Sequence, residues 1–289
     1  SVVVEAADGE AAKTPAHLAE LLEALARAEL SRDDVVVAVG GGALTDLAGL
    51  AAALYRRGVG VVMVPTTLAG QADAAIGGKT AVNLDVGKNL MGAIHQPLGV
   101  LCDLDTLATL PTREMAAGSA EIAKCWLLER RGAASVATTS LADRVAVAAA
   151  LKAAVVSADE REAGGRALLN YGHTLAHALE AIARERGDDL RHGEAVAVGL
   201  AFAARLARGL GRVGGDAVAE HDATLAAFGL SGRPPFAVAA DDLLAAMAHD
   251  KKSRHDLAFV LDGPGGFALV AGVAPTAVAR ELELFWEAS

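Results

Sequence analysis

A run of β-branched residues that ends in three glycines and continues into an alanine-rich helix constrains the fold of this chain most. Residues 35–39 predict a buried strand, Gly40, Gly41 and Gly42 a tight turn, and residues 43–55 an amphipathic helix. Further buried strands are predicted at 59–64 and 100–103. Apolar strands that alternate with helices are typical of a parallel sheet with helices on both faces. The first hundred residues therefore predict an α/β fold.

The second part of the chain has a different pattern. Helical periodicity dominates from Thr112 to about Ala248, with breaks at the glycines 132, 164, 165, 187, 214 and 215. A hairpin is expected from residues 257–261 and 267–270, followed by a final helix over 275–286. We therefore predict an α/β domain at 1–110 and a mainly helical domain at 111–289, with the ligand site in the cleft between them.

Composition and charge exclude several classes of protein. The 289 residues are 53% hydrophobic and 21% charged, so the chain can bury a core and is not disordered. The formal net charge is −10 and there is no long basic run, so no nucleic acid is expected as a partner. No stretch reaches the roughly 18 apolar residues of a membrane span. Two cysteines without metal-ligand spacing favour a reducing compartment, and we expect a soluble cytoplasmic protein.

Glycines and lysines in the α/β part indicate an anion site. The glycine turn at 40–42 can bring backbone N–H groups close to a pyrophosphate, although a tight strand-to-helix turn uses glycine as well. Residues 73–80 and 87–89 combine glycines with Lys79 and Lys88, which favours phosphate binding over a surface loop. The segment is not a P-loop, because Asp73 stands where that motif has its first glycine.

Histidines in the helical part indicate a divalent metal site. His173 and His177 are four residues apart and share one helix face, and His192 begins the next apolar helix. Glu121 lies within an otherwise apolar helix. Two imidazoles with a carboxylate can bind zinc and leave a position open for substrate. A single histidine is more often structural, but three within twenty residues favour a site, and the absence of HExxH disfavours a zinc peptidase.

Taken together, these segments resemble the 3-dehydroquinate synthase family of sugar phosphate cyclases. The matching segments follow the family's order: AVGGGALTDLAG (38–49), RGVGVVMVPTTLAGQADAAIGGKTAVN (57–83), GKNLMGAIHQP (87–97), AGSAEIAK (117–124), KAAVVSADEREAGGRALLNYGHTLAHALE (152–180), HGEAVAVG (192–199) and DKK (250–252). The resemblance implies a Rossmann-like NAD-binding domain followed by an all-α metal-binding domain.

The resemblance also implies an activity. Members of this family are phosphate-eliminating lyases of the shikimate pathway, which leads to the aromatic amino acids. They convert 3-deoxy-D-arabino-heptulosonate 7-phosphate into 3-dehydroquinate and phosphate by transient oxidation, phosphate elimination, reduction and aldol cyclisation. The implied cofactors are NAD+ and a divalent metal, Zn2+ or alternatively Co2+. The implied assembly is a homodimer.

Residues are assigned to roles by their position in the matching motifs. The implied metal ligands are Glu121, His173 and His192. The implied NAD+ contacts are Glu10, Lys13, Gly41, Gly42, Asp46, Thr66, Thr67, Lys88 and Thr109. The implied substrate contacts are Asp73, Lys79, Asn89, Lys124, Lys152, Arg166, Asn170, His177 and Lys251, and Arg57 is expected to reach the phosphate across a dimer interface.

The chain departs from the family pattern in a few places, and other functions are considered. The opening strand–helix–strand unit of the family, which completes the sheet and part of the nucleotide pocket, has no counterpart here, and Ala81 replaces a usual glycine. The alternatives are another sugar phosphate cyclase, a metal-dependent alcohol or glycerol dehydrogenase, and a non-catalytic relative. Lys152, Arg166 and Asn170, with Lys251, keep the residue types of a dehydroquinate-forming enzyme.

Overall fold

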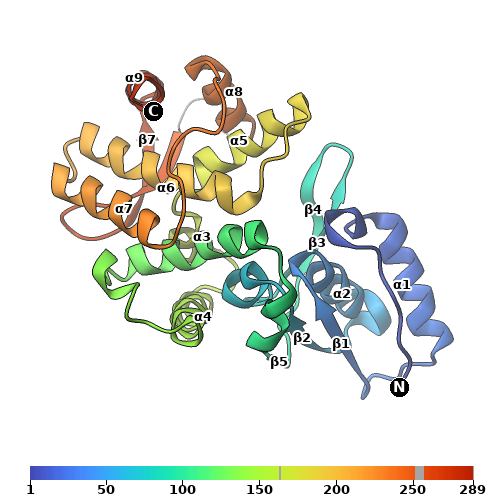
Figure 1. Ribbon diagram of the computed structural model, residues 1–289. Coiled ribbons are helices and arrows are strands. Elements are labelled where there is room, and N and C mark those ends of the chain that lie inside the picture. Colours follow the sequence, from blue (N-terminus) through green and yellow to red (C-terminus); the bar gives the residue numbers. More distant parts are fainter. Residues whose placement is uncertain (163, 251–256, 289) are drawn as a thin grey trace. The chain divides into compact units, whose positions relative to one another are not determined.

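The computed structural model describes residues 1–162, 164–250 and 257–288 (Figure 1). Two compact units form: unit 1 comprises Ser1–Gly118 and Ala148–Ser157, and unit 2 comprises Ser119–Val147 and Ala158–Ser289. The division falls inside two helices, α3 (Thr112–Leu128) and α4 (Leu141–Ala158). The domain boundary expected after residue 110 stays a prediction. Lys251 lies outside the described residues.

Unit 1 is built on a parallel sheet with the strand order β1–β2–β5. β1 (Val35–Gly40) pairs with β2 (Gly60–Pro65) along its whole length, and β2 pairs with β5 (Gly99–Val100). The glycine turn leads directly from β1 into α2 (Gly42–Leu54), with Gly41 as the N-cap. The predicted parallel α/β fold is confirmed, and the third strand is shorter than its apolar sequence indicates.

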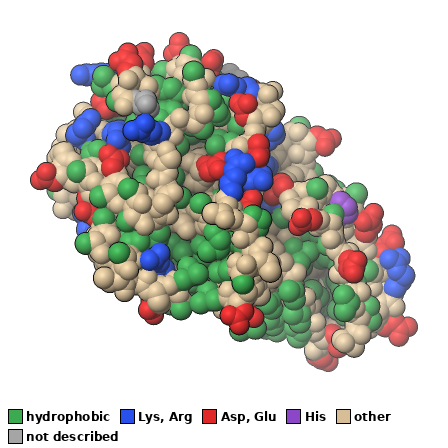
Figure 2. All heavy atoms as spheres, viewed as in Figure 1, with side chains coloured by type: hydrophobic (Ala, Val, Ile, Leu, Met, Phe, Trp, Pro, Cys, Tyr) green, Lys and Arg blue, Asp and Glu red, His purple; other side chains and the backbone are tan. Residues whose placement is uncertain are grey.

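The two faces of this sheet differ in their covering. Val36 and Ala38 of β1 lie in a cluster with Val61 and Met63, which packs under α2. On the other face Val35, Val37 and Val39 are 43%, 58% and 57% exposed. Hydrophobic side chains lie at the surface in this region (Figure 2). At β1, among the described residues, helices therefore cover one face of the sheet and leave the other face exposed.

The remaining elements of unit 1 surround α2. α1 (Pro15–Arg27) is capped by Thr14 and packs Leu18 and Leu25 against α2. An antiparallel hairpin of β3 (Lys79–Leu84) and β4 (Gly87–Ile94) forms where the sequence predicts only a polar, glycine-rich stretch. Short helical turns complete the unit: η1 (Gly9–Ala12), η2 (Tyr55–Arg57), η3 (Gly70–Ala74) and η4 (Leu104–Thr109).

Unit 2 is mainly helical, as predicted. Besides its parts of α3 and α4 it contains η5 (Ala133–Ser135), η6 (Gly165–Asn170), α5 (His173–Arg186), α6 (His192–Gly209), α7 (Gly215–Ala227), α8 (Ala240–Asp250) and α9 (Pro275–Glu287). The expected hairpin forms from β6 (Leu257–Leu261) and β7 (Ala268–Val273). α6 is buried almost all round, because α5, α7, α9 and β6 pack against it. No helix in the described ranges is both long and apolar enough to span a membrane.

Candidate functional site

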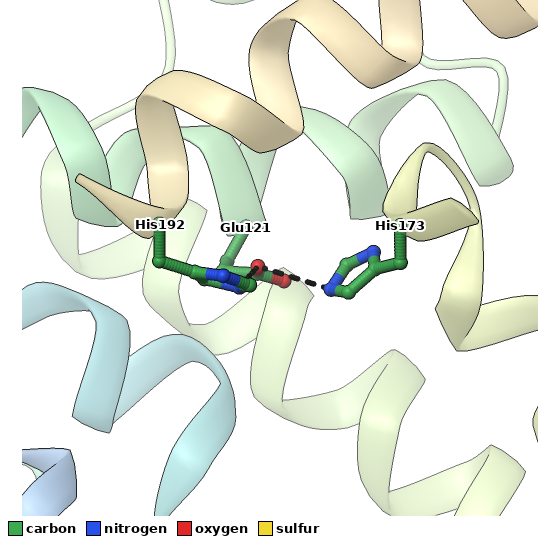
Figure 3. Close-up of side chains that lie close together, drawn as sticks. All are labelled: Glu121, His173 and His192. Atoms are coloured by element: carbon green, nitrogen blue, oxygen red, sulfur yellow. Dashed lines mark hydrogen bonds and ion pairs between the residues drawn. The ribbon is translucent and has the colours of Figure 1, made fainter. Parts of the chain in front are cut away.

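Three helices of unit 2 bring one carboxylate and two imidazoles together (Figure 3). Glu121 comes from α3, and His173 and His192 are the first residues of α5 and α6. Oε1 of Glu121 lies 3.2 Å from Nε2 of His192 and 3.6 Å from Nε2 of His173. One ligand atom from each of the three residues lies within 4.8 Å of the others. We call these three residues the Glu–His–His cluster.

The spacing of the cluster fits a divalent cation. Zinc binds imidazole nitrogen and carboxylate oxygen at about 2.0–2.2 Å, so two ligands of a tetrahedral ion lie about 3.4 Å apart. The two separations from Glu121, 3.2 and 3.6 Å, lie on either side of that value. Three protein ligands leave a fourth position for water or substrate, as catalytic zinc sites require. The ligand types and their spacing therefore suit Zn2+ or a similar ion.

The protonation states of Glu121 and His173 suit a metal site as well. At His192 the effect of burial is outweighed by the hydrogen bonds to Glu121 and Glu180, which raise its pKa to about 10, so a metal would have to displace a proton there. Burial alone would raise the pKa of Glu121, but the charge of Lys124 and hydrogen bonds from the two histidines hold it well below its usual value. Lys124 lies one turn further along α3, and its Nζ donates to Oε2 of Glu121 at 2.5 Å. Burial, with the charge of Lys124, lowers the pKa of His173. An ionised carboxylate and a neutral imidazole are the forms that bind metal.

A close contact between backbones sets the spacing of the two ligand helices. Gly172 is the N-cap of α5 and has φ +79°, a conformation that favours glycine. Gly199 of α6 packs directly on it: a Cβ at Gly199 would lie 1.9 Å from the carbonyl oxygen of Gly172. The two glycines therefore let α5 and α6, with their first residues His173 and His192, approach closely.

In unit 1, the glycine turn gathers predicted cofactor contacts at the carboxyl ends of β1 and β2. The amide of Thr66 donates to the carbonyl of Gly40, and a Cβ at Gly41 would come 3.0 Å from Cγ2 of Thr67. A Cβ at Gly42 would come equally close to Ala74. Backbone N–H groups at the start of α2 can bind an anion here, and parallel α/β sheets bind ligands at this edge.

Lys13 connects three predicted contact residues of unit 1. Its side chain is 5% exposed, and its Nζ donates to Oδ2 of Asp46 at 2.6 Å and to Oδ1 of Asn89 at 2.5 Å. Burial raises the pKa of Asp46, and the charge of Lys13 offsets this only in part. Lys13 also lies 4.0 Å from Glu10. The ammonium group of Lys13 thus connects the N-terminal segment with α2 and with the β3–β4 hairpin.

Asn83 is a connecting residue that sequence reasoning missed. Its side chain donates to Oε1 of Glu10 at 2.7 Å and accepts from the backbone N–H of Asn89 at 2.9 Å. Its own N–H donates to the carbonyl of Lys13. Asn89, whose N–H takes part in one of these bonds, has a left-handed conformation with φ +57°. Nothing in the local sequence of Asn83 signals this role, because its partners come from distant segments.

Replacing Lys13 by methionine should weaken NAD+ binding about tenfold. Methionine keeps the apolar stem but removes the charge-assisted hydrogen bonds to Asp46 and Asn89, each worth about 1.5–3 kcal/mol. Titration of NAD+ by calorimetry would measure the effect. Arg27→Met is a matched control, because Arg27 forms an exposed ion pair with Glu23. Unchanged NAD+ affinity in Lys13→Met would contradict the prediction.

The other predicted substrate contacts have local partners. Nζ of Lys152 lies 2.7 Å from Oδ1 of Asp73 within unit 1. In unit 2, buried Arg166 donates to the carbonyl of Glu160 at 2.5 Å. Five further substrate contacts are exposed: Asn170 and His177 of unit 2, and Arg57, Lys79 and Asn89 of unit 1. Three predicted NAD+ contacts of unit 1 are exposed as well: Glu10, Lys88 and Thr109. His177 stays outside the Glu–His–His cluster, with its ring 5.6 Å from that of His173.

A parallel sheet with a glycine turn, together with a helical unit that carries a Glu–His–His cluster, defines the class of dehydroquinate synthase-like proteins. The comparisons agree with this class. Residues 3–117 match the model of the 3-dehydroquinate synthase N-terminal domain, and residues 118–253 match that of the C-terminal domain. The chain belongs to the 3-dehydroquinate synthase family.

Curated relatives and solved structures support the same assignment. A putative aminodehydroquinate synthase of Amycolatopsis mediterranei is 49% identical over 98% of this chain and 79% of the relative. A 3-dehydroquinate synthase of Mycobacterium leprae is 48% identical over 90% of this chain and 74% of the relative. The structure of a 2-deoxy-scyllo-inosose synthase complexed with carbaglucose-6-phosphate, NAD+ and Co2+ has a TM-score of 0.82 at 30% identity, covering 94% of this chain and 80% of that one.

Proposed function

We propose that the chain is a 3-dehydroquinate synthase, which converts 3-deoxy-D-arabino-heptulosonate 7-phosphate into 3-dehydroquinate and phosphate. The observation that carries this proposal is the Glu–His–His cluster, formed by three helices in a member of the 3-dehydroquinate synthase family. The curated relatives at about 45% identity bear the same name, so a dehydrogenase and a non-catalytic relative are not favoured.

The proposed cofactors are a divalent metal held by Glu121, His173 and His192 and NAD+ at the carboxyl edge of the unit 1 sheet. A bound metal supplies Lewis acidity toward substrate hydroxyls, and NAD+ supplies a reversible hydride acceptor. Lys124 holds the Glu121 carboxylate in its ionised form. The buried ammonium groups of Lys13 and Lys152 fix Asp46, Asn89 and Asp73, which we propose as contacts to cofactor and substrate.

The remaining site residues fit an anionic substrate. A sugar acid phosphate carries a carboxylate and a phosphate, and lysine and arginine are the side chains that bind such groups. We propose Lys79, Lys152, Arg166, Lys251 and, across a dimer interface, Arg57 for these contacts, with Asn89, Asn170 and His177 for the hydroxyl groups. Gly41, Gly42, Thr66, Thr67, Lys88, Thr109 and Glu10 are proposed for NAD+.

Removal of metal should abolish phosphate release, and zinc should restore it. Protein dialysed against a chelator is expected to release phosphate from 3-deoxy-D-arabino-heptulosonate 7-phosphate at less than one hundredth of the original rate. Addition of Zn2+ with NAD+ should recover the rate, because the cluster would then hold its ion again. A colorimetric phosphate assay measures the outcome. Phosphate release that is unaffected by chelation would contradict a metal-dependent cyclase.

An amino-substituted counterpart is a second candidate reaction. The observation in its favour is the relative named as a putative aminodehydroquinate synthase, which is as similar to this chain as the 3-dehydroquinate synthases. Mass spectrometry of the product from each of the two substrates, the hydroxyl form and its amino analogue, distinguishes them. The substrate with the higher kcat/KM identifies the reaction.

Three finer assignments complete the proposal. Zn2+ is proposed as the native metal, supported by its preference for nitrogen and oxygen ligands in a tetrahedral site. A 2-epi-5-epi-valiolone synthase from Streptomyces hygroscopicus, solved with NAD+ and Zn2+ bound, has a TM-score of 0.81 at 29% identity over 98% of this chain and 82% of that one. The homodimer and the cytoplasmic location stay predictions from the sequence.

A further inference from the structure

We infer that Glu180 is a positioning residue that orients the imidazole of His192 for metal binding. This inference rests on the proposed metal site. Oε2 of Glu180 lies 3.2 Å from Nδ1 of His192, and Nε2 of the same ring lies 3.2 Å from Oε1 of Glu121. The ring is therefore held between two carboxylates, one on each of its nitrogens. With a metal on Nε2 the ring would keep one N–H, on Nδ1, and donating that N–H to Glu180 would fix the orientation of the ring.

The helix places Glu180 where it can act on a ligand of another helix. Glu180 is seven residues after His173 on α5, which is two turns, so both side chains lie on one face. His173 belongs to the Glu–His–His cluster itself, whereas Glu180 contacts His192 at the start of α6. α5 therefore supplies one ligand and the orientation of a second ligand.

His192 depends more than His173 on such a partner. The side chain of His173 is 11% exposed, and its Nδ1 is 3.0 Å from the backbone carbonyl oxygen of Tyr171. The side chain of His192 is 44% exposed, so less packing restrains its ring. A hydrogen bond between the N–H of Arg191 and Glu194 fixes the main chain at this helix start, but not the ring. The Glu180 side chain is 13% exposed and thus able to restrain the ring from a defined position.

Zinc affinity of the apo-protein tests the inference directly. Apo wild type, Glu180→Ala and Glu180→Gln would each compete for Zn2+ with a chromophoric chelator of known affinity. Loss of an outer partner of a metal-binding histidine typically costs 10–100-fold in affinity, and we expect this loss in Glu180→Ala. Glu180→Gln should lose less, because its amide oxygen accepts the same N–H. Glu185→Ala is the matched control, an exposed glutamate on the same helix, and should bind zinc like wild type.

A double-mutant cycle separates positioning from a general structural role. If Glu180 acts through His192, then Glu180→Ala should cause little further loss of zinc affinity in a His192→Ala background. The visible spectrum of the Co2+-loaded protein gives a second readout, because its bands report the coordination geometry. They should shift in Glu180→Ala and stay close to wild type in Glu185→Ala. If Glu180→Ala does not fold, the Co2+ spectrum and the zinc affinity of Glu180→Gln test the inference instead. Values equal to those of wild type in both measurements would then overturn it.

The outcomes distinguish this inference from the proposed function. Wild type that binds zinc, with equal affinity in Glu180→Ala, would overturn the inference and leave the metal site intact. If Glu180→Ala lowered zinc affinity equally in wild type and in the His192→Ala background, Glu180 would not act through the His192 ring. That result would also overturn the inference. Wild type that binds no zinc would overturn the proposed metal site, and the inference with it.

Discussion

The Glu121→Ala variant is expected to lose phosphate release by at least a thousandfold and to unfold more easily than wild type. Glu121 is the carboxylate of the Glu–His–His cluster, and no neighbouring side chain of α3 can replace its charge at that position. Its removal also takes away an ion-pair partner of Lys124, and both side chains are only 2% exposed. Removal of one member of a buried ion pair costs about 3–5 kcal/mol.

Two measurements and one control check this expectation. The phosphate assay gives the activity, and urea denaturation of the apo-protein gives the free energy of unfolding. Glu129→Ala is the control, since Glu129 follows the same helix and pairs with Arg131 near the surface. Such pairs contribute less than about 1 kcal/mol, so the control should be active and stable. Retention of a tenth of the activity by Glu121→Ala would mean that the metal site lies elsewhere.

The Gly199→Ala variant is expected to show the second large effect, although it adds only a methyl group. Its Cβ would lie 1.9 Å from the carbonyl oxygen of Gly172, so α5 and α6 must move apart. Insertion of a methyl group into a closely packed interface costs about 1–3 kcal/mol, and a backbone clash lies at the upper end. Since these helices carry His173 and His192, we also expect at least a tenfold loss of zinc affinity.

Gly209→Ala on the same helix is the control for Gly199→Ala. The three atoms nearest to its Cβ would all belong to the flexible side chain of Glu281, whose carboxylate can turn away. Alanine also has a higher helix propensity than glycine, so the control should be neutral or slightly stabilising. Urea denaturation and zinc titration compare the two variants. If Gly199→Ala and Gly209→Ala changed stability and zinc affinity equally, the close contact between α5 and α6 would not be the cause.

Local sequence patterns predicted those elements in which buried side chains recur at the spacing of a strand or a helix. The strand at Val35, the glycine turn and α2 follow from a β-branched run, glycines and an alanine-rich helix. The end of α5 in unit 2 was also predictable: the helix ends at Arg186, and its C-cap Gly187 has φ +73°. In these places the hydrophobic pattern and the glycine that ends it lie within a few residues of one another. A short stretch of sequence is therefore enough to predict the element.

The β3–β4 hairpin was missed because β4 does not alternate between buried and exposed residues. β4 is exposed at most of its positions, so no buried face repeats every second residue. Gly92 marks a close approach instead: a Cβ there would lie 2.4 Å from the carbonyl oxygen of Thr80 in β3. A glycine used in this way carries no hydrophobic signal, and the sequence therefore predicts a loop.

Sequence chemistry predicted the ligand types of the site but not its full geometry. His173 and His177 share a helix face, yet it is His192 of another helix that joins His173 beside Glu121. The pairing of Lys13 with Asn89 spans 76 residues, so no local pattern predicts it. Glu180 resembles an ordinary polar position of an amphipathic helix until the fold places it against His192.

The arrangement of ligands on α3, α5 and α6 has a consequence for folding thermodynamics. Glu121 and His192 are 71 residues apart, so a cation bound by both would act as a reversible cross-link that closes a long loop. Such a link lowers the entropy of the unfolded chain, much as a disulfide does. A ligand at a thousand times its dissociation constant stabilises the native state by about 4 kcal/mol. The melting temperature of the helical unit would then depend on the free zinc concentration, and metal supply would control how long this protein stays folded.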